Sequence, residues 1–161
     1  MRRWIFGLFL VILPGVAAAE SWRSYHNTRF GVTADRPAGW TMAEPPENND
    51  GRIFVSPDGS ATVTISGGRA LESRAEEMRR RAEPAEGETI TYAKQGPNWI
   101  VTSGVRADRI FYRKAILSCR DSIWNDLTIE YPAADKTKYD SLVAHAAASL
   151  KPGPGYDTDC K

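Results

Sequence analysis

Apolar and polar residues alternate with a period of two in TRFGVTADRP and SATVTISG. This period places successive side chains on opposite faces of a strand, so these two segments, with the short apolar segment RIFVS between them, predict three strands. Four more strands are predicted for ETITYAK, WIVTSGV, IFYRKAILSC and WNDLTIEYP, which are rich in β-branched and aromatic residues. RIFVS is apolar on both faces, which favours a place near the middle of a covered sheet.

Two other segments repeat apolar side chains at helical intervals, and each predicts a helix with one apolar stripe. The stripes are Leu71, Ala75, Met78 and Ala82 in the first segment, and Tyr139, Leu142, Val143, Ala146 and Leu150 in the second. The turns QGPN, GVRADR and CRDS are too short for crossovers, so the later strands are expected to pair antiparallel. The predicted fold is α+β: an antiparallel sheet of six to seven strands with two helices packed on it.

Two Asp-Gly turns lie in the stretch ENNDGRIFVSPDGSATVTISGG. SPDGS has Pro and Gly where a tight turn between two strands requires them, so it predicts a β-hairpin. ENNDG partly matches the EF-hand calcium loop, whose first and twelfth positions would fall on Pro46 and Pro57. Proline supplies no side-chain oxygen, so the calcium interpretation fails. ENNDG is expected to lead from a proline-rich loop into the strand that begins near Arg52.

The N-terminus has the pattern of a cleaved secretion signal. Arg2 and Arg3 precede the apolar run Trp4–Leu13, and the small residues AAA follow at positions 17–19. The run is shorter than the roughly 20 residues needed to span a bilayer. We expect cleavage between Ala19 and Glu20, leaving residues 20–161 as a single domain with a short C-terminal tail, 152–161. The expected location is extracytoplasmic, in the periplasm.

The two cysteines, Cys119 and Cys160, both lie in the predicted mature chain. In an oxidising compartment an even pair without metal-ligand spacing predicts a disulfide. It would close a loop of 42 residues and, by the chain-entropy model, contribute about 4 kcal/mol. A catalytic thiol is the alternative, but a tail cysteine is poorly placed for chemistry that needs fixed geometry.

Charge and motifs exclude several classes of function. The predicted mature chain has 19 basic and 20 acidic side chains, whereas nucleic-acid binding requires an excess of positive charge. No further apolar run after the signal is long enough to span a membrane. There is no nucleophile elbow, P-loop, dinucleotide fingerprint or zinc motif, and His26 and His145 lack metal-ligand spacing. We therefore expect no cofactor, no metal and no nucleic acid as a partner.

The order of several sequence words resembles the PsbP-like superfamily, in particular its small secreted bacterial members. The words are YHNTRFGVTADRPAGW, PPENNDGRIFVSPDGSATVTISG, NWIVTSGVRADRIFYRK and IEYPAADKTKYDSLVAHAAASL. The resemblance covers residues 22–150 and implies an α/β/α sandwich around an antiparallel sheet. Its characterised branches are accessory or binding proteins, among them a photosystem subunit and a partner of a small GTPase. The resemblance implies no catalytic motif and no site residue.

The expected function is that of a secreted, non-enzymatic binding or accessory domain of the cell envelope, with an unknown protein or small ligand as its partner. An extracytoplasmic hydrolase-like enzyme with a non-standard site and a purely structural envelope component are the alternatives. Polar and aromatic residues at strand ends form the candidate partner surface, because Trp and Arg are enriched in binding hot spots. These residues are Asn49, Asp50, Arg52, Trp99, Arg106 and Arg109.

Overall fold

The structure is a computed structural model that describes residues 21–158 and 160. Its main element is an antiparallel sheet of seven strands in the order β3-β4-β5-β9-β8-β7-β6. The strands are β3 (Thr41–Met42), β4 (Gly51–Val55), β5 (Thr62–Arg69), β6 (Glu88–Gln95), β7 (Trp99–Arg106), β8 (Arg109–Ser118) and β9 (Ile123–Pro132). The predicted α+β fold with an antiparallel sheet is confirmed.

Two further strands, β1 (Trp22–His26) and β2 (Thr33–Pro37), pair in a separate two-stranded sheet. The sequence predicted the second of them but not the first, because the polar residues of WRSYH obscure any alternation. The expectation for RIFVS was wrong. This segment forms β4, which lies one strand from the edge, and Ile53 is 45% exposed.

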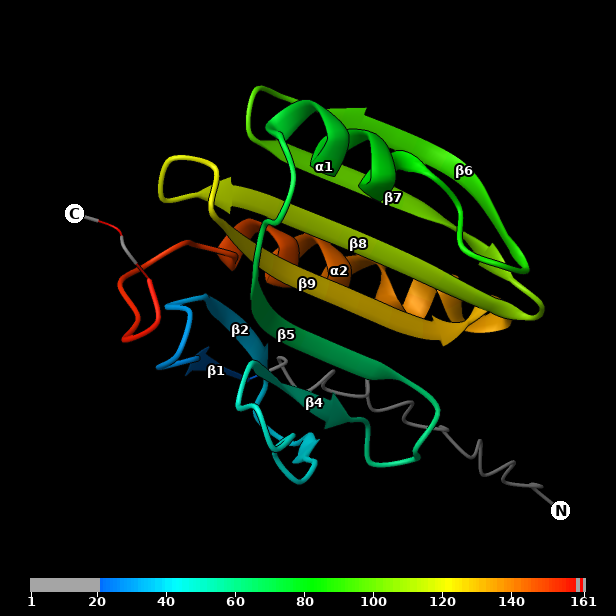
Figure 1. Cartoon of the computed structure of the whole chain (residues 1–161). Coiled ribbons are helices and arrows are strands. Elements are labelled where there is room, and N and C mark those ends of the chain that lie inside the picture. The colour runs from blue at the N-terminus through cyan, green and yellow to red at the C-terminus, as the bar shows by residue number, and fades with distance from the viewer. Residues whose placement is uncertain (1–20, 159, 161) are drawn as a thin grey trace, which may run out of the picture.

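The elements form three layers, the α/β/α sandwich that the resemblance implied (Figure 1). Helix α1 (Arg74–Ala82) lies on one face of the sheet. Helix α2 (Lys136–Ser149), which follows the short 3-10 helix η1 (Ala133–Asp135), lies on the other. The β1–β2 hairpin shares this second layer with α2, and His145 of α2 stacks on Trp22 at 3.9 Å between ring centroids.

The larger hydrophobic core lies between the sheet and the second layer. It includes Phe54, Leu127 and Ile129 from the sheet and Leu142 from α2, each no more than 2% exposed. A smaller cluster on the opposite face places Met78 of α1 near Trp124. Burial of apolar surface is the main force that holds the layers together. The α2 layer, which buries the larger cluster, is therefore packed on the sheet more extensively than α1.

Helix α1 begins later than predicted. Ser73 is its N-cap, and the Ser73 hydroxyl accepts a hydrogen bond from the Glu76 amide at 3.4 Å. Leu71, placed in the apolar stripe by its spacing, precedes the helix and is 83% exposed. An oxygen acceptor at the N-cap satisfies an amide that the helix leaves free, so Ser73 decides where the helix starts.

The C-terminal tail returns to the hairpin and to the β8–β9 turn. Thr33 and Lys151 form an isolated bridge, and Asp157 makes ion pairs with Arg29 and Arg69. The predicted disulfide between Cys119 and Cys160 is present, with a Cα–Cα distance of 4.7 Å. Among the residues that the structure describes, no helix is long and apolar enough to cross a membrane.

Candidate binding groove

The sheet is wider than the layer that covers it on the α2 face. Seven strands about 4.8 Å apart make it about 30 Å wide. A helix about 10 Å across and a two-stranded hairpin of similar width cover only about 20 Å of this. The core places α2 and the hairpin over β4, β5, β9 and part of β8, so the face of β7 and β6 is left open beside α2.

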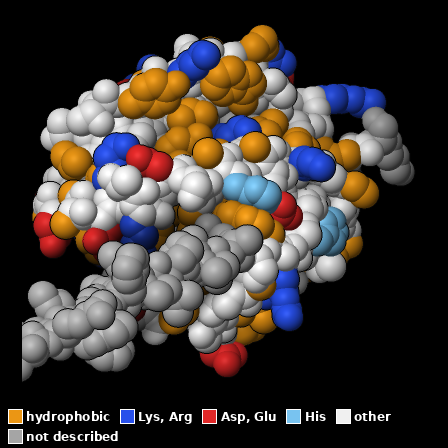
Figure 2. All heavy atoms as spheres, turned by 180° about the vertical axis from the view of Figure 1, so that it is seen from behind, with side chains coloured by type: hydrophobic (Ala, Val, Ile, Leu, Met, Phe, Trp, Pro, Cys, Tyr) orange, Lys and Arg blue, Asp and Glu red, His pale blue; other side chains and the backbone are white. Residues whose placement is uncertain are grey.

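The open strands and α2 enclose a groove of about 620 Å³, here called the apolar groove. Figure 2 shows this face, with hydrophobic side chains gathered toward the top of the view and basic side chains among them. The lining residues are Tyr92, Lys94, Trp99, Val101, Tyr112, Lys114 and Ile116 from the sheet, and Asp140, Val143, Ala144, Ala147 and Ala148 from α2. The alanines are small, so the helix wall leaves room above the aromatic floor.

Strand register sets the pattern of the groove floor. Tyr92, Ser103 and Tyr112 are cross-strand neighbours on β6, β7 and β8. Lys94, Val101 and Lys114 form the next row in the same way. Each row therefore has a small or apolar residue in the middle, with a larger polar-tipped side chain on either side.

Trp99 lies at one end of the groove, where the β6–β7 hairpin turns. A Cβ built on Gly96 would come within 2.2 Å of the Trp99 indole nitrogen. The indole therefore packs directly on the glycine backbone, and only glycine leaves space for it. The structure places Trp99, one of the residues predicted for a partner surface, at the mouth of this groove.

The two groove lysines differ in their surroundings. The Lys114 ammonium donates a hydrogen bond to the Ala147 carbonyl oxygen in the last turn of α2 at 2.6 Å, and burial lowers the pKa of Lys114. Lys94 is exposed. Among the described residues, no carboxylate forms an ion pair with either lysine. Asp140, which also lines the groove, is paired with Lys136 at 2.8 Å.

Burial raises the pKa of Tyr112, and the neighbouring Tyr92 adds to the shift. Among the described residues, neither tyrosine hydroxyl has a hydrogen-bond partner. The groove therefore presents apolar rings and methyl groups together with two ammonium groups and two phenol groups. These groups can bind a ligand through apolar contacts and hydrogen bonds.

The opposite face of the sheet carries a second hollow, of about 580 Å³, at the end of α1. We call it the polar hollow. Asp126 lies in it and accepts hydrogen bonds from both terminal nitrogens of Arg81, one of them at 3.2 Å. Burial raises the pKa of Asp126, and the charge of Arg81 opposes this shift. Arg81 in turn stacks on Trp124 with its guanidinium carbon 3.9 Å from the ring centroid.

The other carboxylates of this face are also paired with arginine. Glu88, whose side chain is fully buried, accepts two hydrogen bonds from Arg113, one of them at 2.9 Å. These bonds hold the pKa of Glu88 below its ordinary value. Glu130 pairs with Arg106 at 3.0 Å. The carboxylates of this face therefore form ion pairs with arginines from α1, β7 and β8.

The six residues predicted for a partner surface lie in three separate places. Arg106 and Arg109 are neighbours at one end of β7 and β8, and Trp99 lies at the other end of β7. Asn49 and Asp50 precede β4, with Arg52 at its start, on the far side of the sheet. The fold does not bring all six together, and whether any of them binds a partner stays a prediction.

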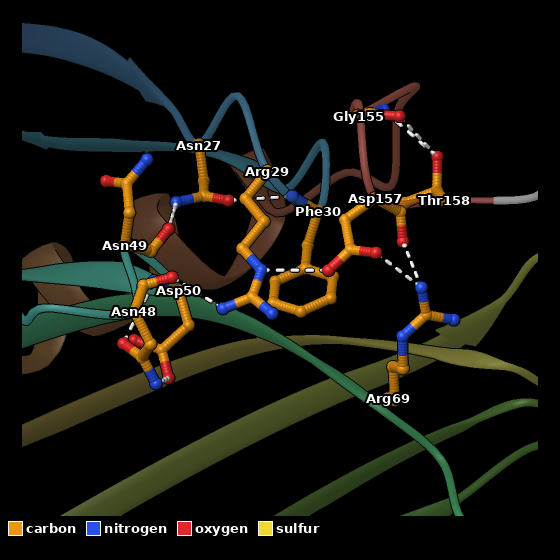
Figure 3. A network of polar contacts seen from close by, with 10 residues as sticks. All are labelled: Asn27, Arg29, Phe30, Asn48, Asn49, Asp50, Arg69, Gly155, Asp157 and Thr158. Carbon is orange, nitrogen blue, oxygen red and sulfur yellow. Dashed lines mark hydrogen bonds and ion pairs between the residues drawn. The ribbon is translucent and has the colours of Figure 1, made fainter.

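The loop at Asn49 and Asp50 is tied to the C-terminal tail (Figure 3). Asn27 donates to the Asn49 carbonyl oxygen at 2.9 Å, and Arg29 joins the Asn48 carbonyl oxygen to Asp157. The side chain of Asn49 accepts from Arg52 at 3.0 Å. Most of the polar groups that made this stretch conspicuous in the sequence are thus hydrogen-bonded within the protein. These contacts give Asn48, Asn49 and Arg52 a structural role, which is to hold the loop in place.

Sequence reasoning missed most of the apolar groove. Tyr92, Tyr112, Lys94 and Lys114 were assigned to strands, and the groove alanines Ala144, Ala147 and Ala148 were not in the apolar stripe predicted for the second helix. The available signal was the apolar alternation of ETITYAK, combined with the alanine run AHAAAS. Neither pattern shows whether α2 and the β1–β2 hairpin extend far enough to cover these strands.

A metal site has no support in the geometry of the described residues, where no group of three His, Cys, Asp or Glu side chains is close enough to hold an ion. His145 instead approaches Asp35, with 3.0 Å between the imidazole Nε2 and a carboxylate oxygen.

Comparison with known proteins identifies the fold. No protein-family model matches the chain, and no curated protein sequence matches it. Among solved structures, it is similar to cyanobacterial PsbP (CyanoP) from Synechocystis sp. PCC 6803, with a TM-score of 0.58 and 12% identity, over 89% of this chain and 98% of that one.

Two other solved structures are comparably similar. LpqN of Mycobacterium tuberculosis, described as involved in cell envelope biogenesis, has a TM-score of 0.56 and 9% identity over 84% of this chain and 92% of its own. The Ran-binding protein Mog1p of Saccharomyces cerevisiae has a TM-score of 0.55 and 8% identity over 83% of this chain and 96% of its own. The chain therefore has a PsbP-like fold, as the resemblance in sequence implied.

Proposed function

We propose that this protein is a non-enzymatic binding or accessory protein of the cell envelope, exported to the periplasm, and that the apolar groove is its binding site. The observation that carries the proposal is the partly exposed floor of the groove. Tyr92 of β6, in the floor, is 51% exposed, and Val105 of β7, beside the groove, is 37% exposed. Aromatic and aliphatic side chains gain free energy when they leave water, so an open row of them favours a bound partner.

The size of the groove supports the same function. Ligand sites are concave, mostly apolar and about 300–1,000 Å³ in volume, with a few polar groups that orient the ligand. The apolar groove, at about 620 Å³ with two lysines and two tyrosines among apolar residues, lies within that range.

The similar structures also support a binding or accessory role, since one is described as Ran-binding and another as involved in envelope biogenesis. The disulfide fits an oxidising, extracytoplasmic compartment. The proposed cleavage site, Ala19 and Glu20, lies outside the described residues.

The proposed location has a test of its own. Protein isolated from its native compartment should show the mass of a chain that begins at Glu20. The same sample, denatured without reductant, should contain no free sulfhydryl, because Cys119 and Cys160 are paired. An intact N-terminus together with two reactive thiols would contradict export.

The binding role can be tested by amide NMR mapping. Labelled protein is titrated with protein and lipid fractions of the envelope, each prepared separately. We expect shifts in β6, β7, β8 and α2 around the groove, from one fraction. Shifts confined to the polar hollow, or no shifts with any fraction, would contradict the proposal.

One observation favours the enzyme alternative. Asp126 lies in a hollow, and burial raises its pKa, as catalytic acids require. Against it, both carboxylate oxygens of Asp126 accept hydrogen bonds from Arg81, whose positive charge opposes the rise in the Asp126 pKa and holds the carboxylate as a structural ion pair. An Asp126→Asn variant that lost a hydrolytic activity shown by the wild-type protein, while remaining folded, would establish the enzyme. A purely structural envelope component would bind nothing in the groove.

A further inference from the structure

We propose that the apolar groove binds a single-chain amphiphile with an anionic head group, a carboxylate or a phosphate. The head group would lie between Lys94 and Lys114 and the hydrocarbon tail along α2. This inference rests on the proposed binding function and specifies its ligand.

The shape of the groove favours a long apolar tail. A second hollow of about 270 Å³ adjoins it and shares Tyr92, Tyr112, Asp140 and Val143 with it. The two together follow α2, whose 14 residues span about 20 Å at 1.5 Å per residue. A compact polar ligand would leave most of this apolar lining exposed to water.

The charges favour an anionic head. Lys136 and Lys138, on α2, have carboxylate partners in Asp140 and Asp58, respectively. Among the described residues, Lys94 and Lys114 have no such partner. The end of α2 that Lys114 contacts carries about half a negative charge, which offsets only part of the two positive charges. Charge complementarity therefore selects an anion at this row.

The row also has the right spacing for one head group. Lys94 and Lys114 lie two strands apart on either side of Val101, which is about 10 Å between their backbones. Both side chains are long enough to bring their ammonium groups to one carboxylate or phosphate. The free hydroxyl of Tyr112, one residue pair along, is a further donor to it.

A second copy of this chain is a less suitable occupant. β6 is an edge strand of the sheet, and edge strands can pair between molecules. In a twofold dimer, however, the same patch would face itself, so the unpaired lysines of one groove would approach those of the other.

A cationic or nonionic amphiphile is also a less suitable occupant, because it would leave the lysines without a counter-charge.

The test is calorimetric titration of the protein, purified after expression of the full chain, with amphiphiles kept below their micelle concentrations. The probes are dodecanoate, dodecyl phosphate, dodecyltrimethylammonium and a nonionic dodecyl ether. We expect both anions to bind at least tenfold more tightly than the other two probes. Each methylene added to the carboxylate series should lower Kd about two- to fourfold. The ratio between carboxylate and phosphate distinguishes a fatty acid from a phospholipid-like source.

Variants locate the binding. Ala144 is exposed on the groove side of α2, and Ala144→Glu places a negative charge beside the tail. We expect at least a tenfold loss of affinity. Ser141→Glu adds the same charge to the same helix at an exposed residue outside the groove lining, and should change Kd less than twofold.

Lys94→Gln should weaken binding of the anions about three- to fivefold, with no effect on the nonionic probe. Lys138→Gln is its control.

Equal affinity for cationic, nonionic and anionic probes would overturn the assignment of the head group. An absence of binding by every probe, or equal loss in Ala144→Glu and Ser141→Glu, would overturn the amphiphile. In either case the NMR mapping with envelope fractions still decides the proposed function separately, because a protein partner would shift the groove amides without any of these probes.

Discussion

The two faces of the sheet carry hollows of similar volume but different construction. In the polar hollow and along the face around it, Asp126, Glu88 and Glu130 each pair with an arginine. In the apolar groove, Lys94 and Lys114 have no carboxylate partner among the described residues, and the aromatic floor is partly exposed. Their volumes alone, about 580 and 620 Å³, would not show which of the two hollows binds a ligand.

The difference suggests how to separate a structural site from a binding site in this fold. Where each charge is satisfied within the protein, its removal should cost stability and leave binding unchanged. Where charges and rings are left without partners, their removal should cost binding and leave stability unchanged. The predictions below test this division, from the largest expected effect on stability to the smallest.

The largest effect is expected for Glu77→Ala, on the buried side of α1. Glu77 is 7% exposed and accepts hydrogen bonds from the Trp124 indole and the Leu71 amide, both at 2.9 Å. The substitution leaves the buried Trp124 indole N–H without an acceptor and also removes the partner of the Leu71 amide, which should lower the free energy of unfolding by about 3 kcal/mol. Urea unfolding measures it. Glu76→Ala, at its less buried neighbour, should cost less than about 1 kcal/mol, and equal losses would show that burial of Glu77 is not what matters.

A smaller and pH-dependent effect is expected for Glu88→Gln. The pKa of Glu88 is lowered in the folded protein, chiefly by its hydrogen bonds from Arg113. The stabilisation it provides is therefore present above the ordinary pKa of 4.5 and is lost as the pH falls through the lowered value. The variant should be less stable than the wild type by about 2 kcal/mol at pH 7.

Urea unfolding at a series of pH values checks the sign. The difference between the wild type and Glu88→Gln should shrink toward zero as the pH falls well below 4.5. The contribution of Asp126 runs the other way but is common to both proteins, so it cancels. A difference that grows in acid would contradict the assigned role of Glu88.

The smallest effect on stability is expected for Tyr92→Ser in the groove. The ring is 51% exposed and its hydroxyl has no partner among the described residues, so the free energy of unfolding should change by no more than about 0.5 kcal/mol. Thermal unfolding checks the stability, and titration with dodecanoate checks the loss of affinity. A large loss of stability with unchanged affinity would assign Tyr92 to the core instead.

Local pattern was enough to predict much of this fold. Alternation located β5, and β-branched and aromatic residues located β8 and β9. The SPDGS segment forms the expected turn, with the Ser56 amide donating to the Ala61 carbonyl oxygen at 2.9 Å. The cysteine pairing followed from number and compartment. The α2 stripe was also right, since Tyr139, Leu142 and Ala146 are buried.

The groove could not be predicted in this way, because alternation shows that a strand has two faces but not what covers them. Whether Tyr92 and Val101 meet solvent or a helix depends on where α2 comes to rest, about fifty residues later in the chain. Trp99 was found only because tryptophan is common at binding surfaces. Asn49 and Asp50 drew attention as loop residues. Their loop is linked to the tail through Arg29, which bonds both the Asn48 carbonyl oxygen and Asp157, and no local pattern connects Asp157 to the loop.

The most direct test of the central claim uses two neighbouring residues on β7. Ile100 faces the polar hollow, and Val101 faces the apolar groove. Intermolecular nuclear Overhauser effects are measured between carbon-labelled protein and unlabelled dodecanoate. We predict contacts from the hydrocarbon chain to the methyl groups of Val101, Val143 and Ala147, and none to Ile100. Contacts to Ile100 and Ala115 with none to Val101 would contradict the assignment of the groove.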